Sequence, residues 1–135
     1  MKIRTLSVFM FLFFYLLNFL EAQTANDNPN NNTKAEISFS KMVHDYGIIK
    51  KGADGSCEFK FKNTGKEPLL LTNVSTSCGC TVPTWPKEPI KPRKTDVIKV
   101  VYDTKRLGTI NKTITVWSNA KTQSVVLTIK GMVTE

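Results

Sequence analysis

The chain has 135 residues, enough for one ordinary domain and too few for several. Nineteen basic and 11 acidic residues give it a formal net charge of +8, which favours anionic partners such as polyanionic polymers or lipid head groups; a soluble surface that is simply rich in lysine is the alternative. No basic cluster with interleaved aromatic residues is present, and this argues against nucleic acid as a partner.

The chain opens with the features of a secretory signal peptide. Lys2 and Arg4 precede an apolar run over residues 6–20, and Ala22 is a small residue just after it. The run is shorter than the ~20 residues that span a bilayer. We expect cleavage near Ala22, or else at Ala25, a periplasmic or extracellular location, and no stable membrane span afterwards. An uncleaved membrane anchor is the alternative.

Composition divides the chain into three parts. Residues 1–22 form the predicted signal peptide. Residues 23–35 form an Asn-rich leader, and because it has no large apolar residue to bury, we expect it to be flexible. Residues 36–135 form the single predicted domain.

Within this domain, apolar and polar residues alternate with a period of two, and turn residues separate the runs. The clearest strand has Cys57, Phe59 and Phe61 on one face. About seven short strands and no convincing helix predict an all-β, immunoglobulin-like sandwich, with a small barrel as the alternative. Five lysines are predicted to lie on the outward phase and to discourage edge-to-edge aggregation: Lys60, Lys62, Lys99, Lys112 and Lys130.

The segment from Ser77 to Thr95 differs from the rest because it holds four prolines and a Cys-Gly-Cys motif. Prolines lack the donor that a central strand needs, so we predict a stiff connecting loop or an edge excursion. Ile90 and Trp85 are expected to anchor this segment to the core. Trp117 falls on the outward phase of its own strand, and with Trp85 it forms the candidate contact surface.

Cys78 and Cys80 are the candidate functional or disulfide pair. A disulfide needs Cβ atoms about 3.8 Å apart, so a bond between them requires the backbone to bend at Gly79. The loop entropy of such a three-residue ring is only ~1.6 kcal/mol, against ~3 for a 15-residue loop. Four interpretations stay open: a local structural disulfide, a reduced pair with a packing role, a redox-active pair, and a soft-metal site, with Cu(I) as the ion that thiolates select.

The remaining cysteine and the single histidine have simpler interpretations. Cys57 shares the phase of Phe59 and Phe61, so we predict a core residue, although pairing with Cys78 or Cys80 is the alternative. His44 could act as a third metal ligand, but an exposed histidine at a strand end is the ordinary interpretation. We predict no cofactor and no dedicated metal site.

Several motifs along residues 36–135 resemble a known family. They are Asp45-Tyr46-Gly47-x-Ile49, Phe59-x-Phe61-x-Asn63-Thr64-Gly65, Thr76-Ser77-Cys78-Gly79-Cys80-Thr81, Val100-x-Tyr102-Asp103 and Leu127-x-Ile129-x-Gly131. This pattern is similar to the bacterial "SCGCT" domain-of-unknown-function family, common in exported proteins of the Bacteroidota. The resemblance implies a fold of the Hydin and major-sperm-protein branch of immunoglobulin-like domains, an exported location and no known activity. His44 replaces the usual large apolar residue, and Pro92-Arg93 replaces the usual Pro-Gly, which puts the turn type in doubt.

No arrangement of residues in the sequence supports an enzyme. One histidine, scattered carboxylates and no nucleophile-elbow or phosphate-loop motif leave little for acid–base or nucleophilic catalysis. We therefore predict a non-enzymatic binding or scaffolding module of the cell envelope, whose partner is an envelope protein or an anionic polymer. The alternative is a thiol-redox or Cu(I)-binding protein that acts through Cys78 and Cys80.

Overall fold

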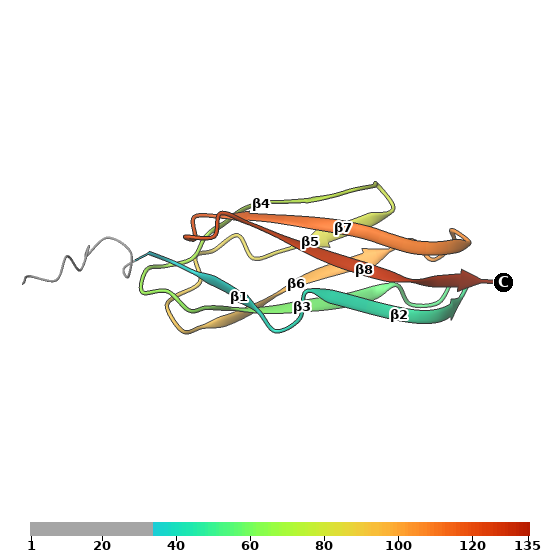
Figure 1. Ribbon diagram of the computed structural model, residues 1–135, viewed down its shortest axis with the longest axis horizontal. Coiled ribbons are helices and arrows are strands. Elements are labelled where there is room, and N and C mark those ends of the chain that lie inside the picture. The colour runs from blue at the N-terminus through green and yellow to red at the C-terminus, as the bar shows by residue number, and fades with distance from the viewer. Residues whose placement is uncertain (1–33) are drawn as a thin grey trace, which may run out of the picture.

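The computed structural model describes residues 34–135 (Figure 1). The predicted signal peptide, and all but two residues of the predicted leader, lie outside the described residues. Eight strands form the fold: β1 (Ile37–Phe39), β2 (Val43–Lys50), β3 (Ser56–Asn63), β4 (Leu71–Thr76), β5 (Thr81–Thr84), β6 (Thr95–Tyr102), β7 (Gly108–Ser118) and β8 (Ser124–Thr134). In this part of the chain no helix is long and apolar enough to cross a membrane.

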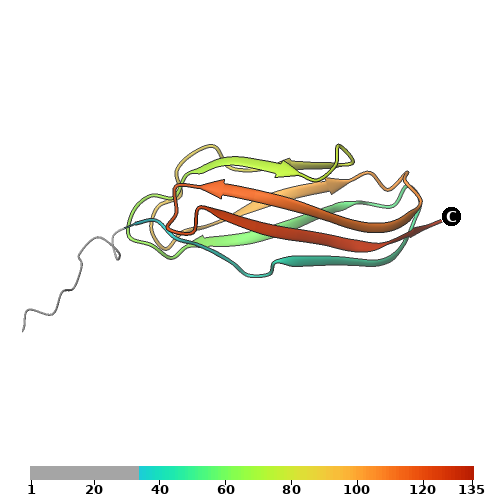
Figure 2. The same ribbon diagram turned by 45° about the horizontal axis from the view of Figure 1, so that its top comes forward.

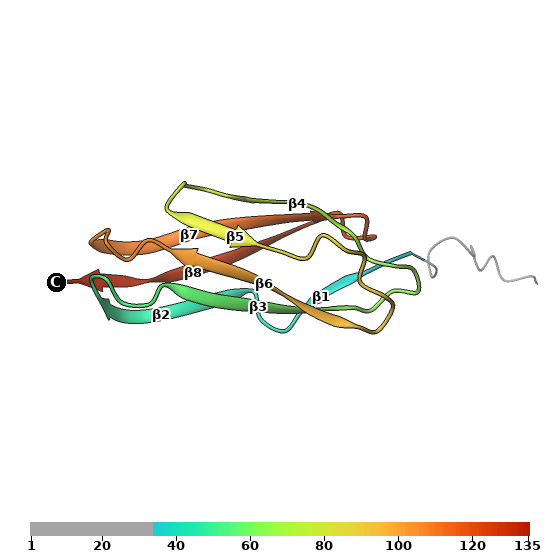
Figure 3. The ribbon, with the colours of Figure 1, turned by 180° about the vertical axis from the view of Figure 1, so that it is seen from behind.

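The strands form two four-stranded sheets that pack face to face, as Figures 1, 2 and 3 show. One sheet has the order β1-β3-β6-β5 and the other β2-β8-β7-β4. Every pairing is antiparallel except that of β2 with β8, which is parallel. The predicted sandwich is therefore confirmed, but with eight strands rather than seven. The extra strand is β5, which contains Pro83 and is tolerated because it lies at a sheet edge.

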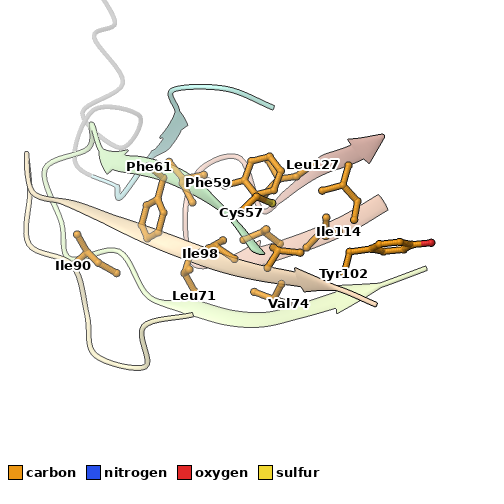
Figure 4. Close-up of a cluster of buried hydrophobic side chains, with 14 of the residues drawn as sticks. Cys57, Phe59, Phe61, Leu71, Val74, Ile90, Ile98, Tyr102, Ile114 and Leu127 are labelled. Carbon is orange, nitrogen blue, oxygen red and sulfur yellow. The ribbon is translucent and has the colours of Figure 1, made fainter. Parts of the chain in front are cut away.

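The alternation within strands places the core between the sheets. In β3, the side chains of Cys57, Phe59 and Phe61 are buried while those between them are exposed. They meet Ile98 of β6 and Leu127 of β8 in the closely packed centre drawn in Figure 4. Burying one such side chain stabilises the fold by roughly 1.5–3 kcal/mol. The prediction that Ile90 and Trp85 anchor the proline-rich segment is confirmed, because Ile90 is buried and Trp85 packs against the core.

One of the five predicted outward lysines was placed on the wrong phase. Lys60, Lys62, Lys99 and Lys130 are exposed, but Lys112 is partly buried. It shares its parity along β7 with the buried Ile110 and Ile114, and Ile129 is its neighbour on β8. In a strand of period two, this parity puts Lys112 on the inner face.

The ordered domain begins earlier than composition indicated. Ala35, predicted to belong to the leader, is only 1% exposed, and its carbonyl oxygen accepts a hydrogen bond from the Lys121 N–H (2.9 Å). The Lys34 carbonyl accepts a bond from the Lys66 N–H (3.2 Å). A Cβ on Gly65 would collide with this carbonyl, so glycine is needed there for the close approach. Lys34 and Ala35 are therefore part of the packed domain.

At the end of the sandwich where β1 begins, a buried asparagine joins the loops. The Asn63 side-chain amide donates to the carbonyl oxygens of Glu67 (2.7 Å) and Ile90 (2.9 Å), and its Oδ1 accepts from the Gly65 N–H (3.0 Å). Its backbone carbonyl accepts from the Arg93 N–H (2.8 Å). The loops before β4 and β6 are thus fixed to β3 by one side chain.

The doubt about the turn at Pro92-Arg93 is resolved by the backbone. The Lys94 N–H donates to the Lys91 carbonyl oxygen (3.1 Å), Pro92 occupies the second position, and Arg93 has a φ of +67°. A proline at the second position of a turn, followed by a positive φ at the third, is typical of a type II turn. The third residue of such a turn is normally glycine. The turn that glycine would form is therefore kept, with arginine in a left-handed conformation.

Candidate functional site

The Cys-Gly-Cys motif lies in the loop that crosses from β4 in one sheet to β5 in the other. Cys78 and Cys80 are joined by a disulfide, with their Cα atoms 5.3 Å apart. Cys78 is partly exposed, whereas Cys80 is only 5% exposed. The backbone bends at the motif, where the Thr81 N–H donates to the Cys78 carbonyl oxygen (3.3 Å). Gly79 is not in the left-handed region, and a Cβ added there would meet nothing within 4 Å. The bend therefore does not itself require glycine.

Neighbouring residues hold this loop independently of the disulfide. The Thr76 hydroxyl lies 2.9 Å from the Cys78 carbonyl oxygen and 3.1 Å from that of Thr81. The Ser77 N–H donates to the Thr113 carbonyl oxygen (3.0 Å), and the Thr113 N–H donates back to the Ser77 hydroxyl oxygen (3.1 Å). The motif is thus bound to β7 and to the start of β5.

A shallow depression of about 440 Å³ adjoins the disulfide. Val82 of β5 and Val101 of β6 are directly opposite each other on the outer face of the sheet, and they are 60% and 51% exposed. The depression is lined by three segments: residues 52–55, Gly79 with Cys80, and Val82 with residues 101–105. We call this end of the sandwich, formed by residues 51–55, 77–82 and 101–107, the disulfide end.

The open edge of β5 borders the same region. The Asp103 N–H donates to the Cys80 carbonyl oxygen (2.9 Å), and β5 pairs with β6 in an antiparallel register. In such a ladder, hydrogen-bonding groups alternate between the partner and the opposite side. The N–H and C=O groups of Val82 therefore point toward β6, and those of Thr81 and Pro83 point toward the open edge.

This edge offers no free donor to another strand. The Thr81 N–H is bonded to Cys78, and the Thr81 carbonyl oxygen is within reach of the Thr76 hydroxyl. Pro83 has no N–H at all. Because strand addition needs donors as well as acceptors along the edge, β5 is blocked as a template for a further strand.

Cys57 is a buried thiol, free of any disulfide. It lies opposite Val100 of β6, which in turn lies opposite Pro83 of β5, so a whole strand separates it from β5. Burial raises the pKa of the Cys57 thiol, and burial also raises the pKa of Tyr46, whose hydroxyl donates to the Gly55 carbonyl oxygen (2.6 Å). Cys57 is thus a protonated core residue, and the alternative pairing with Cys78 or Cys80 is not present.

His44 is far from the disulfide. It lies on β2, at the edge of its sheet opposite to β4, which leads into the Cys-Gly-Cys loop. Three inter-strand spacings separate these edges, or about 14 Å. His44 Nδ1 lies 3.1 Å from Lys41 Nζ, and partial burial together with the Lys41 charge lowers the pKa of His44. Within residues 34–135, no group of three or more His, Cys, Asp or Glu side chains is placed to hold a metal ion.

The two tryptophans of the candidate contact surface lie apart from the disulfide. Trp85 follows β5 and packs on the core, with Lys87 Nζ 3.1 Å from the centroid of its ring. Trp117 is 37% exposed on the other sheet, opposite Asn73 of β4. The two side chains therefore belong to different sheets, and neither lines the depression.

Sequence reasoning missed the exposed pair Val82 and Val101. The sequence contains one indication of this pair. Val101 stands between Val100 and Tyr102, which are both buried, so its side chain must face outward. The pairing of Val101 with Val82 depended on a strand that the proline content concealed.

Comparisons with known proteins agree with this fold. The model of a family described as "Protein of unknown function (DUF1573)" matches residues 37–133. No curated protein matches the chain. A protein of unknown function from Porphyromonas gingivalis W83 superposes with a TM-score of 0.66 and 17% identity, over 75% of this chain and 48% of that one. The present chain thus spans about half the length of that relative.

Two further solved structures have similar folds. PapD-like domain 7 of human CEP192 superposes with a TM-score of 0.64 and 6% identity, over 76% of this chain and 87% of that one. The CsuC–CsuE complex of a chaperone and a tip adhesion subunit, from Csu pili of Acinetobacter baumannii, gives a TM-score of 0.52 and 10% identity, over 74% and 57% of the two chains. At these identities the similarities show a PapD-like, immunoglobulin-like fold and no activity.

Proposed function

Since the chain belongs to a family described only as of unknown function, we propose its function from its own surface. We propose an exported, non-enzymatic module of the cell envelope that binds a partner protein at the disulfide end. The observation that carries this proposal is the directly paired and exposed Val82 and Val101 beside the depression.

The surroundings of the valine pair have the composition of a protein interface. Opposed side chains on adjacent strands have Cβ atoms about 5 Å apart, so Val82 and Val101 form one continuous apolar contact. Asp54, Asp103 and Lys105 stand around the depression and supply polar groups. An apolar centre with a polar rim is typical of protein–protein interfaces.

The stiffness of the loop also favours binding. The Cys78–Cys80 disulfide and the hydrogen bonds of Thr76 and Ser77 hold the loop in one conformation. Ordering a flexible loop on binding costs free energy, so a loop already ordered retains more of the interaction for affinity. The proposed export rests on the signal-peptide features of residues 1–22, and a disulfide suits an oxidising compartment.

The proposal is tested with a charge placed in the apolar pair. Val82→Asp combined with Val101→Asp should abolish recovery of the partner that the wild-type protein cross-links in envelope extracts. The matched control is Val126→Asp, because Val126 is a valine of similar exposure on the other sheet. Equal recovery by the double variant and the wild type, or equal loss in the control, would exclude the disulfide end as the binding surface.

A second candidate function is thiol–disulfide exchange, favoured by the unequal exposure of the two sulfur-bearing residues. An incoming thiolate would bond to the Sγ of the partly exposed Cys78, the disulfide would break, and its electron pair would leave on Cys80 Sγ, which then takes a proton. The dithiol form would also present the soft ligands that Cu(I) prefers.

Equilibration with glutathione redox buffers, followed by alkylation and mass spectrometry, tests this second candidate. Exchange predicts a reduction potential above about −300 mV, because structural disulfides typically have potentials below that value. A pair that stays oxidised in buffers poised below this value contradicts it. A Cys57→Ser variant serves as the control, because it removes the third thiol without touching the motif.

A further inference from the structure

The two ends of the sandwich differ in charge. The end opposite the disulfide is formed by residues 34–36, 64–70, 85–94 and 119–123, and we call it the N-terminal end. It bears seven cationic and three acidic side chains. The disulfide end, including Glu135, bears three of each. An excess of four positive charges therefore lies at one end of the domain.

Backbone hydrogen bonds bring together cations that are far apart in the sequence. Lys34 is bound to Lys66, and its neighbour Ala35 is bound to Lys121. The Asn63 N–H donates to the Lys94 carbonyl oxygen (3.0 Å), which joins the turn of Lys91, Arg93 and Lys94 to the same end of β3. Four separate segments thus supply one basic surface: Lys34, Lys66, Lys91, Arg93, Lys94 and Lys121.

These charges are not neutralised within the domain. Among residues 34–135 the ion pairs are Lys51 with Glu135 and Lys130 with Asp45, and neither involves a cation of the N-terminal end. Of the three acids there, Glu36 accepts hydrogen bonds from the backbone N–H groups of Ile37 (3.0 Å) and Thr122 (3.4 Å). Glu67 and Glu88 are the remaining acids at this end.

Arg93 supplies one of these positive charges although its backbone conformation is strained. Its φ of +67° is a left-handed conformation that disfavours every residue with a Cβ, and glycine would remove the penalty. Within residues 34–135 its side chain makes no hydrogen bond and no ion pair that would explain the arginine. Strain kept at an exposed position supports a functional reason for the residue.

We propose that the N-terminal end docks on an anionic phospholipid surface. The cations come from all the loops of this end, so a flat surface can contact them together, within the ~8–10 Å over which charges act in physiological salt. A membrane surface with anionic lipids provides such a plane, and each Lys or Arg near it strengthens binding by a factor of about five. The first described residue, Lys34, also lies at this end, where its carbonyl oxygen is bonded to Lys66. The disulfide end would then point away from the membrane, toward its partner.

Vesicle sedimentation tests this inference on the protein as purified from cells. The measured mass of that protein shows whether the predicted signal peptide has been removed. The first variant combines Lys66→Gln, Lys91→Gln and Lys94→Gln. The second combines Lys51→Gln, Lys105→Gln and Arg106→Gln, which removes the same charge from the disulfide end. All six side chains are exposed, so both variants should melt like the wild type. The vesicles contain either phosphatidylcholine alone or phosphatidylcholine with phosphatidylglycerol.

We expect binding only to vesicles with phosphatidylglycerol, weakened about 100-fold in the first variant and much less in the second. Equal weakening in both variants would reduce the effect to net charge and overturn the proposal. Absence of binding to phosphatidylglycerol overturns it as well, as does retention on an acidic polysaccharide resin without vesicle binding. If the first variant fails to fold, Arg93→Gly removes one cation from a strained position and should weaken binding about fivefold. Partner recovery by the Val82 and Val101 variant is measured separately, so either proposal can fail alone.

Discussion

Reducing the Cys78–Cys80 disulfide with a phosphine leaves every side chain in place and removes only the covalent link. The link closes a ring of three residues, so its loss should return ~1.6 kcal/mol of chain entropy to the unfolded state. The loop itself should persist, because Thr76 and Ser77 hold it through hydrogen bonds that reduction does not touch. For a domain of about 100 residues, 1 kcal/mol corresponds to roughly 4–8 °C in Tm, so we expect Tm to fall by about 6–13 °C.

Thermal unfolding followed by circular dichroism, with and without reductant, measures this fall. A variant with Cys78→Ala and Cys80→Ala is the control, and its Tm should not respond to reductant although Cys57 remains. A fall below about 2 °C would refute the entropic argument, since it is well under the magnitude expected for the ring. Complete unfolding at 25 °C would refute the other half of the reasoning, that hydrogen bonds alone can hold the loop.

Three further predictions concern the rest of the domain. Arg93→Gly should stabilise it by about 0.5–1 kcal/mol in urea unfolding while Arg93→Ala changes little, because only glycine relieves a positive φ; equal stability of the two variants would contradict the strain. Asn63→Ala should cost about 3 kcal/mol or more in the same assay, because three hydrogen bonds of this fully buried residue, one buried and two part-buried, lose their partner; a loss under about 1 kcal/mol would contradict this. Burial raises the pKa of Tyr46, so the folded state keeps a proton that the unfolded state releases, and stability should be full below pH 10 and fall as the pH rises above it. Tyr46→Phe should flatten this fall in pH-dependent unfolding, and an equally steep fall would assign it elsewhere.

Most of the fold follows from the period-two pattern, because burial on one face is written into alternate residues. In β3, Cys57, Phe59 and Phe61 identify the inner face without any tertiary information. The same rule, applied with the wrong parity, misplaced Lys112, which shares the inner phase with Ile110. The eighth strand was concealed because Pro83 indicates a loop unless it is known that the strand lies at an edge.

The candidate site was only partly predictable for a different reason. The Cys-Gly-Cys motif is contiguous, so the sequence identifies it directly, as it does the burial of Cys57. Val82 and Val101 meet only through the pairing of β5 with β6. The basic surface of the N-terminal end depends on four loops that the sandwich topology brings together, and no window of the sequence contains more than a few of its cations.

Besides its modest stabilisation, the disulfide closes a turn that lies directly before the open edge of β5. The turn that it closes directs the Cys78 carbonyl oxygen to the Thr81 N–H, the one donor that β5 would otherwise offer at its open edge. Since Pro83 lacks an N–H, the edge is closed to strand pairing. A partner that binds at this end, as we propose, would therefore be recognised through side chains, and the exposed apolar ones there are Val82, Val101 and Leu107. In the proposed function, the motif would thus block the addition of a further strand at this edge, and the valine pair would provide the apolar contact for the partner.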